Sequence, residues 1–136
     1  MIRLLVIGFW LGVVAISGVC SFSTPGWAGG GLTALEEKRV LKAIDAECAD
    51  TWCEGDYAFR FERFRCQLER RVCRLDFRAG LPLGEGGRVQ WKVKTFCILH
   101  GIAGISDLLE GPSPHEHLKG AAYHQINRCI DYRVGN

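Results

Sequence analysis

The cysteines of this chain divide into one near the N-terminus and six beyond it. Cys20 ends an apolar N-terminal run, and the other six of the seven cysteines follow residue 47. An even set is what a disulfide framework needs, and such frameworks persist in oxidising compartments. The sequence therefore predicts an exported domain crosslinked through all six of these residues. They are Cys48, Cys53, Cys66, Cys73, Cys97 and Cys129.

Residues 1–28 have the order of a secretory signal peptide. Arg3 gives a positive start, a long uncharged and mostly apolar run follows, and the small residue Ala28 ends a typical cleavage site. We therefore expect cleavage after Ala28 and a secreted or periplasmic location. Two alternatives are an uncleaved segment that stays as an anchor and lipidation of Cys20. Membrane attachment is expected only through such an uncleaved or lipidated N-terminus.

The remaining residues, 29–136, are expected to form a single small domain. They carry sixteen basic and fifteen acidic residues, so net charge gives no reason to expect nucleic acid as a partner. The motifs G-x-S-x-G, the P-loop and H-E-x-x-H are absent from the sequence, and no pattern indicates a cofactor. These observations favour a binding protein over an enzyme.

The first part of this domain has the pattern of a helix. Thr33 and Glu36 form a capping box, and apolar residues then recur at helical spacing. The spacing predicts a helix over residues 34–48. Its buried face is expected to carry Ala34, Leu41, Ile44 and Cys48, with Val40 beside them.

Three later segments alternate apolar and polar residues, as half-buried strands do. They cover residues 57–68, 73–78 and 89–99, and residues 80–87, rich in glycine, are expected to form a loop. The alternation changes parity near Glu62-Arg63, which predicts a bulge there. Placing the apolar residues on one face pairs Leu68 with Cys73, Cys66 with Leu75 and Phe64 with Phe77, and turns Val89, Trp91 and Val93 toward the core.

A second helix-start signal lies near the C-terminus. Ser113 stands as a cap with Pro114 after it and Glu116 three residues on. A shorter helix is expected near residues 107–109. The stripe of the C-terminal helix is expected to carry Leu118, Ala122, Ile126, Cys129 and Ile130.

The order of these elements predicts an α+β fold. An N-terminal helix, a three-stranded antiparallel meander and a C-terminal helix pack in two layers, with the helices on one face of the sheet. The predicted disulfides are Cys48–Cys53, Cys66–Cys73 and Cys97–Cys129. The arrangement resembles in outline the cystatin-like class of small secreted domains. None of the motifs of that class is present, so the resemblance implies an arrangement and no activity.

The strand parity also predicts a cationic sheet face opposite the core. Only one acid, Asp76, is expected on it. Such a face attracts anionic partners, for which the planar guanidinium group of arginine is well suited. We therefore expect an anionic surface or an acidic protein as the partner. The cations are Arg63, Arg65, Arg74, Arg78, Lys92 and Lys94.

An acidic loop is the second candidate contact surface. Five carboxylates fall within residues 45–56, with no basic residue among them, and a hard cation such as calcium uses oxygens at this density. The spacing is not that of an EF-hand. The residues proposed for binding here are Asp50, Trp52, Glu54 and Asp56.

Four histidines lie in the last third of the sequence, at positions 100, 115, 117 and 124. His117 and His124 are two helical turns apart, about 10 Å, which is too far for one shared ion. The leading hypothesis is thus an exported, non-enzymatic binding protein without a metal. One alternative is a small hydrolase with His100 or His124 as base and a carboxylate such as Asp50, Glu54 or Asp107. Another is a calcium-stabilised structural protein.

Overall fold

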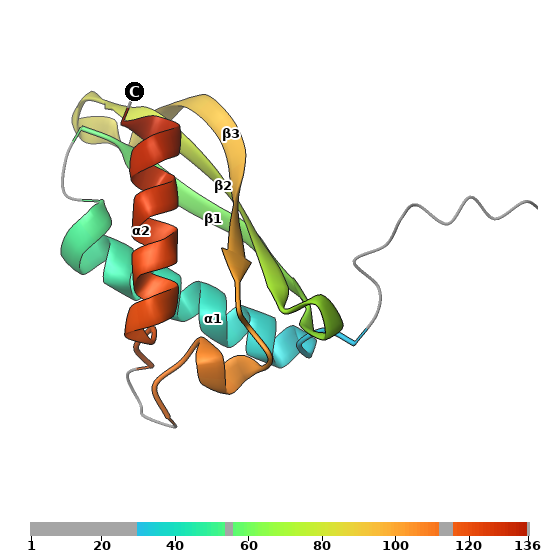
Figure 1. The fold of residues 1–136 in the computed structure, drawn as a ribbon. Coiled ribbons are helices and arrows are strands. Elements are labelled where there is room, and N and C mark those ends of the chain that lie inside the picture. The colour runs from blue at the N-terminus through green and yellow to red at the C-terminus, as the bar shows by residue number, and fades with distance from the viewer. Residues whose placement is uncertain (1–29, 54–55, 112–115, 136) are drawn as a thin grey trace, which may run out of the picture.

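The computed structural model describes residues 30–53, 56–111 and 116–135, so the predicted signal peptide lies outside the described residues. Helix α1 (Ala34–Glu47) leads through a π-helical turn (Cys48–Trp52) into three strands. Strands β1 (Ala58–Gln67), β2 (Val72–Leu83) and β3 (Arg88–His100) form one antiparallel sheet in the order β1-β2-β3. A 3-10 turn (Ile105–Asp107) and helix α2 (Gly120–Val134) follow. The predicted α+β class is confirmed (Figure 1).

Helix α1 begins as its sequence predicts. The Thr33 hydroxyl accepts from the Glu36 backbone N–H, and the Glu36 carboxylate accepts from the Thr33 backbone N–H, which completes the capping box. The bonds that the Glu36 carboxylate accepts from the Thr33 backbone N–H and from the Thr33 hydroxyl lower the pKa of this carboxyl. The buried face differs from the expected one, because the helix packs on the sheet through Val40, Ala43 and Ile44. Of the residues expected to be buried, Ala34 is exposed and Leu41 is half-buried.

The pairing of β1 with β2 differs from the expected register by two residues. Cys66 lies opposite Cys73 and Phe64 opposite Leu75, so the expected pairs Leu68–Cys73, Cys66–Leu75 and Phe64–Phe77 are wrong. The connection is a tight turn in which Arg71 takes a left-handed backbone and its N–H bonds to the Leu68 carbonyl at 3.0 Å. This turn removes Leu68 from the strand. A slip of two residues leaves every side chain on its predicted face.

Two bulges interrupt the sheet, one predicted and one not. The register shifts between Phe61 and Arg63, as the parity change indicated. A second shift separates the pair Ala79–Val93 from the pair Gly80–Trp91. This shift puts Trp91, together with Val89 next to it, on the face opposite the core, so their expected inward orientation is wrong.

Gly80 makes the second bulge possible. A Cβ atom at this position would lie 2.5 Å from the Gln90 carbonyl oxygen and 2.8 Å from Cγ1 of Val89. Only glycine allows the two backbones to come this close. The sequence alone shows this residue as one more loop glycine, which is why the bulge was not expected.

Strand β2 continues to Leu83, so the expected loop over 80–87 is shorter than predicted. Gly84–Gly86 forms a 3-10 turn, and β3 begins at Arg88. β1 begins at Ala58, opposite Gly80, so Pro82 lies beyond the reach of β1 and pairs only with β3. A proline has no N–H to donate, and it is tolerated there because that side of the strand has no neighbour.

Helix α2 begins later than the predicted cap. It starts at Gly120, and Ser113 lies outside the described residues. The preceding chain is extended instead: Leu118 forms a β-bridge with Leu109, and the Lys119 N–H bonds to the Leu108 carbonyl at 2.8 Å. The helical turn expected near 107–109 lies slightly earlier, at Ile105–Asp107.

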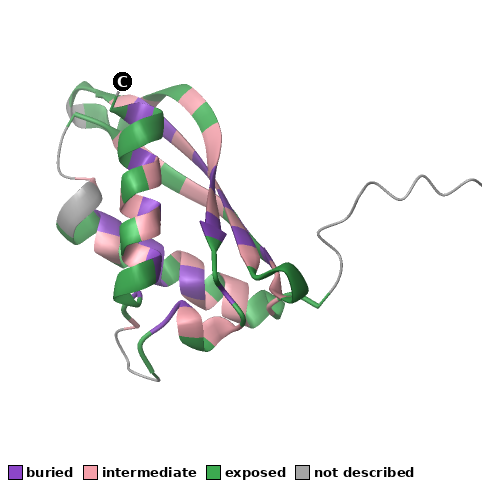
Figure 2. Ribbon diagram, viewed as in Figure 1, coloured by how far each residue is buried: buried purple, intermediate pink, exposed green. Residues whose placement is uncertain are grey.

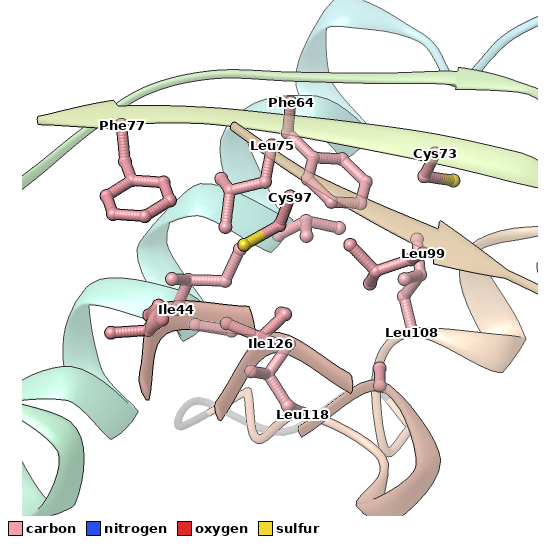
Figure 3. Close-up of a cluster of buried hydrophobic side chains, with 14 of the residues drawn as sticks. Ile44, Phe64, Cys73, Leu75, Phe77, Cys97, Leu99, Leu108, Leu118 and Ile126 are labelled. Carbon is pink, nitrogen blue, oxygen red and sulfur yellow. The ribbon is translucent and has the colours of Figure 1, made fainter. Parts of the chain in front are cut away.

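Both helices pack on one face of the sheet, where the core lies. Figure 3 shows Phe64, Leu75 and Cys97 directed from the strands toward Ile44 of α1 and Ile126 of α2. The three disulfides are those predicted: Cys48–Cys53 closes the end of α1, Cys66–Cys73 crosses the β1–β2 hairpin, and Cys97–Cys129 joins β3 to α2.

Candidate binding surface

The side chains of β2 alternate sharply between the two faces of the sheet. Its odd-numbered residues from Cys73 to Ala79 are buried, whereas Arg74, Asp76 and Arg78 are partly exposed on the other side (Figure 2). We call that side the outer face. Among the described residues, the helices cover only the inner one. The outer face is therefore free to contact a partner.

Cations occupy neighbouring positions on the outer face. Arg65 lies opposite Arg74 across the β1–β2 pair, and Arg60, Arg78 and Lys94 form a row across all three strands. Like charges directly opposite one another destabilise a sheet. The charge pattern is therefore not one that the stability of the sheet alone would favour.

Two acids lie among these cations, one more than the sequence indicated. The Asp76 carboxylate accepts from Arg74 Nε at 2.8 Å. The Glu62 carboxylate extends from the β1 bulge to Arg78 Nε at 2.5 Å, with Lys94 Nζ 3.9 Å away. Glu62 was not expected here, because the parity of a bulge residue is undefined in the sequence.

A hollow of about 200 Å³ opens on this face, lined by Glu62, Arg63, Arg74, Asp76 and Lys94. Three of its side chains are cations and two are carboxylates. It therefore offers donors to an anionic group and acceptors to hydroxyl groups at the same place.

The predicted cations lie on the outer face with one exception. Arg63, Arg65, Arg74, Arg78 and Lys94 all occupy outer-face positions, whereas Lys92 is exposed within the second bulge. Sequence reasoning missed a further residue there.

That missed residue is Arg60, which lies opposite Arg78. Arg60 alternates with Phe59 and Phe61, which face the core. Following the alternation of β1 back across the first bulge therefore predicts that Arg60 lies on the outer face. Arg60, Arg63 and Arg65 have no ion-pair partner within the part of the chain that the structure describes.

Phe96 adds an aromatic ring to this face. The guanidinium carbon of Arg74 lies 4.0 Å from the ring centroid, and that of Arg133, from the end of α2, lies 5.5 Å from it. Stacking of this kind holds a guanidinium group in place without neutralising it. Arg74 is therefore ordered by both Asp76 and Phe96.

The acidic loop does not form a compact cluster in the described residues. Asp50 and Asp56 are exposed, and Glu54 and the Trp52 side chain lie outside the described part. Burial raises the pKa of the nearby Asp45 carboxyl. Within the described residues, no three histidine, cysteine or acidic side chains are placed to hold a metal ion.

The histidines are dispersed. His100 and His124 are exposed, and the Asp107 carboxylate accepts from the Ala103 backbone N–H. A carboxylate does approach His117, whose Nδ1 lies 3.2 Å from Glu47 Oε1 on α1. The described part of the structure thus shows no contact between either proposed base and its proposed carboxylate partners.

Comparison with protein-family models, curated proteins and solved structures finds no match for this chain. None of the helices in the described part of the chain is long and apolar enough to cross a membrane. The function is therefore inferred from the outer face itself.

Proposed function

We propose that this protein is an exported binding protein whose outer face contacts an anionic partner. The proposal rests on two sets of cations that lie opposite one another in the sheet. The first is the pair Arg65 and Arg74, and the second is the row Arg60, Arg78 and Lys94. Asp76 and Glu62 offset only part of this charge, so the opposed cations still repel one another in the free protein. An anionic partner relieves that repulsion, so binding and the unusual pattern have one explanation.

The domain as a whole does not attract anions by its net charge. Basic and acidic residues beyond position 28 nearly balance, so the cations of the outer face are offset by acids elsewhere. An attractive field from such a molecule is local and directional. The partner is therefore expected to bind on one side only, with an affinity that falls as salt rises.

The test reverses charge on β1 alone. In Arg60→Glu/Arg63→Glu/Arg65→Glu the changed residues are all exposed, and none of them contributes an ion pair in the described structure. We expect this variant to elute from a dextran sulfate column at markedly lower salt than the wild type, because three attractive charges have become repulsive.

A matched control changes net charge by the same amount elsewhere. Lys38→Glu/Lys42→Glu/Arg128→Glu alters exposed helix residues and leaves the sheet intact. If the outer face is the binding surface, this control elutes close to the wild type. Equal loss in both variants would show a net-charge effect and would overturn the proposal.

The hydrolase and calcium hypotheses gain no support from the described residues. A hydrolase needs a base within hydrogen-bond distance of its partner, and a calcium site needs several oxygens at one point. In the part that the structure describes, neither His100 nor His124 contacts one of its proposed carboxylate partners, and no three possible ligands are placed to hold a metal ion. The histidine that has a carboxylate within hydrogen-bond distance is His117, beside Glu47.

A further inference from the structure

We infer that the end of the β2–β3 hairpin inserts into the headgroup region of an anionic lipid bilayer. We call this end, residues 81–91, the hairpin tip. The inference rests on the proposed function, because it names the partner of the same cationic face. It also departs from the expectation that membrane contact would come only through the N-terminus.

Exposed apolar side chains are concentrated at this end of the sheet. Leu83 is 49% exposed and Trp91 38% exposed, and Tyr57, which precedes β1 at the same end, is 39% exposed. Two other large apolar side chains in the described residues are exposed, and to a larger fraction: Leu35 at 68% and Tyr132 at 70%. Exposed apolar groups gathered at one place mark a contact surface.

The hairpin tip has no third strand beside it. β1 begins at Ala58, opposite Gly80, so the pairs from Leu81–Gln90 to Leu83–Arg88 form a two-stranded ribbon. The second bulge turns Trp91 to the outer face, where it follows the row of Arg78 and Lys94. A tryptophan ring with cations directly behind it is the arrangement found at membrane interfaces.

Cations outnumber acids around the hairpin tip, where Glu85 is the one acid of the sequence between residues 81 and 100. Arg88 and Lys92 are exposed on β3 itself, and the row of Arg60, Arg78 and Lys94 lies just behind it. Each lysine or arginine near an anionic bilayer adds attraction, and apolar side chains add insertion. A soluble polyanion would use the cations and leave the apolar side chains in water.

The hairpin tip lies at the end of the sheet opposite to Gly30, where the described part of the chain begins. The Gly30 carbonyl accepts from the Leu68 N–H beside the β1–β2 turn, whereas the hairpin tip lies at the far end of β2 (Figure 1). β2 is 12 residues long, which corresponds to about 40 Å. Binding of the hairpin tip to a bilayer can thus be distinguished from attachment through the N-terminus, because the two contacts involve opposite ends of the sheet.

The experiment uses Trp91 as the reporter. The chain has four tryptophans, so Trp10→Phe/Trp27→Phe/Trp52→Phe leaves Trp91 as the only one. The protein purified from the exported fraction is mixed with vesicles of phosphatidylcholine alone, or of equal parts phosphatidylcholine and phosphatidylglycerol. We expect a blue shift of the emission and quenching by brominated lipid chains with the anionic vesicles only, both reduced by salt.

A pair of matched variants separates insertion from charge. Leu83→Ser/Trp91→Ser removes the apolar side chains of the hairpin tip, and we expect co-sedimentation with anionic vesicles to fall by about tenfold or more. Leu35→Ser removes an exposed apolar side chain at the start of α1, at the opposite end of the domain, and is expected to bind as the wild type does. Thermal melts of both variants verify that they fold.

The outcomes distinguish this inference from the proposed function. Unquenched Trp91 emission, or wild-type sedimentation of Leu83→Ser/Trp91→Ser, would overturn insertion. Binding to dextran sulfate without binding to anionic vesicles would also overturn it, and in both cases the proposed function stands if the β1 charge reversal still weakens binding. If neither probe responds to that charge reversal, both proposals are wrong.

Discussion

The two faces of the sheet are built from the same three strands but have opposite character. On the inner face Phe64, Leu75 and Phe77 are fully buried under two helices, and two of the three disulfides join residues there. On the outer face Arg65 lies opposite Arg74, and Arg78 lies between Arg60 and Lys94; in the described structure no helix or further strand covers them. The inner face therefore determines whether the domain folds, and the outer face is free to be shaped by what it contacts.

The largest expected effect tests the inner face against its immediate neighbour. Phe64→Ala removes a fully buried ring and is expected to lower the free energy of unfolding by about 3–5 kcal/mol. Arg65→Ala, one residue on and facing outward, is expected to change it by less than about 0.5 kcal/mol. Urea unfolding followed by circular dichroism measures both. Similar losses would show that the two faces are not energetically distinct.

The next effect concerns the crosslinks. Cys97→Ala/Cys129→Ala opens a bond that spans 32 residues, and the loop it closes predicts a loss of about 3–4 kcal/mol. Cys48→Ala/Cys53→Ala opens one that spans 5 residues, away from the sheet, for which about 2 kcal/mol is expected. Denaturant midpoints of the two variants rank the bonds, and the reverse order would contradict the loop-length account.

A smaller effect tests the second bulge, which places Trp91 on the outer face. Gly80→Ala puts a methyl group against the Gln90 carbonyl and is expected to destabilise the domain by about 1–3 kcal/mol. Gly86→Ala, with nothing within 4 Å of the added carbon, is the control and is expected to be neutral. A shift of the Trp91 emission only in Gly80→Ala would show that the bulge sets the position of this ring.

The smallest effect has the opposite sign. Arg65→Glu replaces a like-charged pair with Arg74 by an opposite-charged one, and is expected to stabilise the domain by about 0.2–1 kcal/mol. The same change is expected to weaken retention on dextran sulfate. A variant that is more stable but binds less would show that the outer face sacrifices stability for contact. Destabilisation by Arg65→Glu would argue against the repulsion on which the proposed function depends.

Much of the inner face could be predicted from the sequence because burial imposes a regular pattern. The alternation of Phe64 and Cys66, then Cys73 and Leu75, shows which residues face the core whatever the exact register. The three cysteine pairs were predicted as well, although the predicted register placed Cys66 opposite Leu75 and only the observed register puts it opposite Cys73. Register itself was not predictable, because a shift of two residues leaves the pattern unchanged and only the left-handed Arg71 determines the turn.

The parts that could not be predicted are those that break a pattern. The second bulge needs the close backbone approach at Gly80, which one glycine among several does not indicate. The late start of α2 reflects the bridge from Leu118 to Leu109, a long-range contact that outweighs the local cap. Glu116, expected to cap that helix, instead accepts from Arg39 Nε at 2.6 Å, which raises the pKa of Arg39.

The connectivity of the disulfides has a consequence for biogenesis. Each bond joins neighbours in the series of six cysteines, so first pairs with second, third with fourth and fifth with sixth. A polypeptide threaded into an oxidising compartment from its amino end can close every native bridge as soon as the second thiol of that pair emerges. Maturation along this route needs no shuffling of wrong linkages by an isomerase.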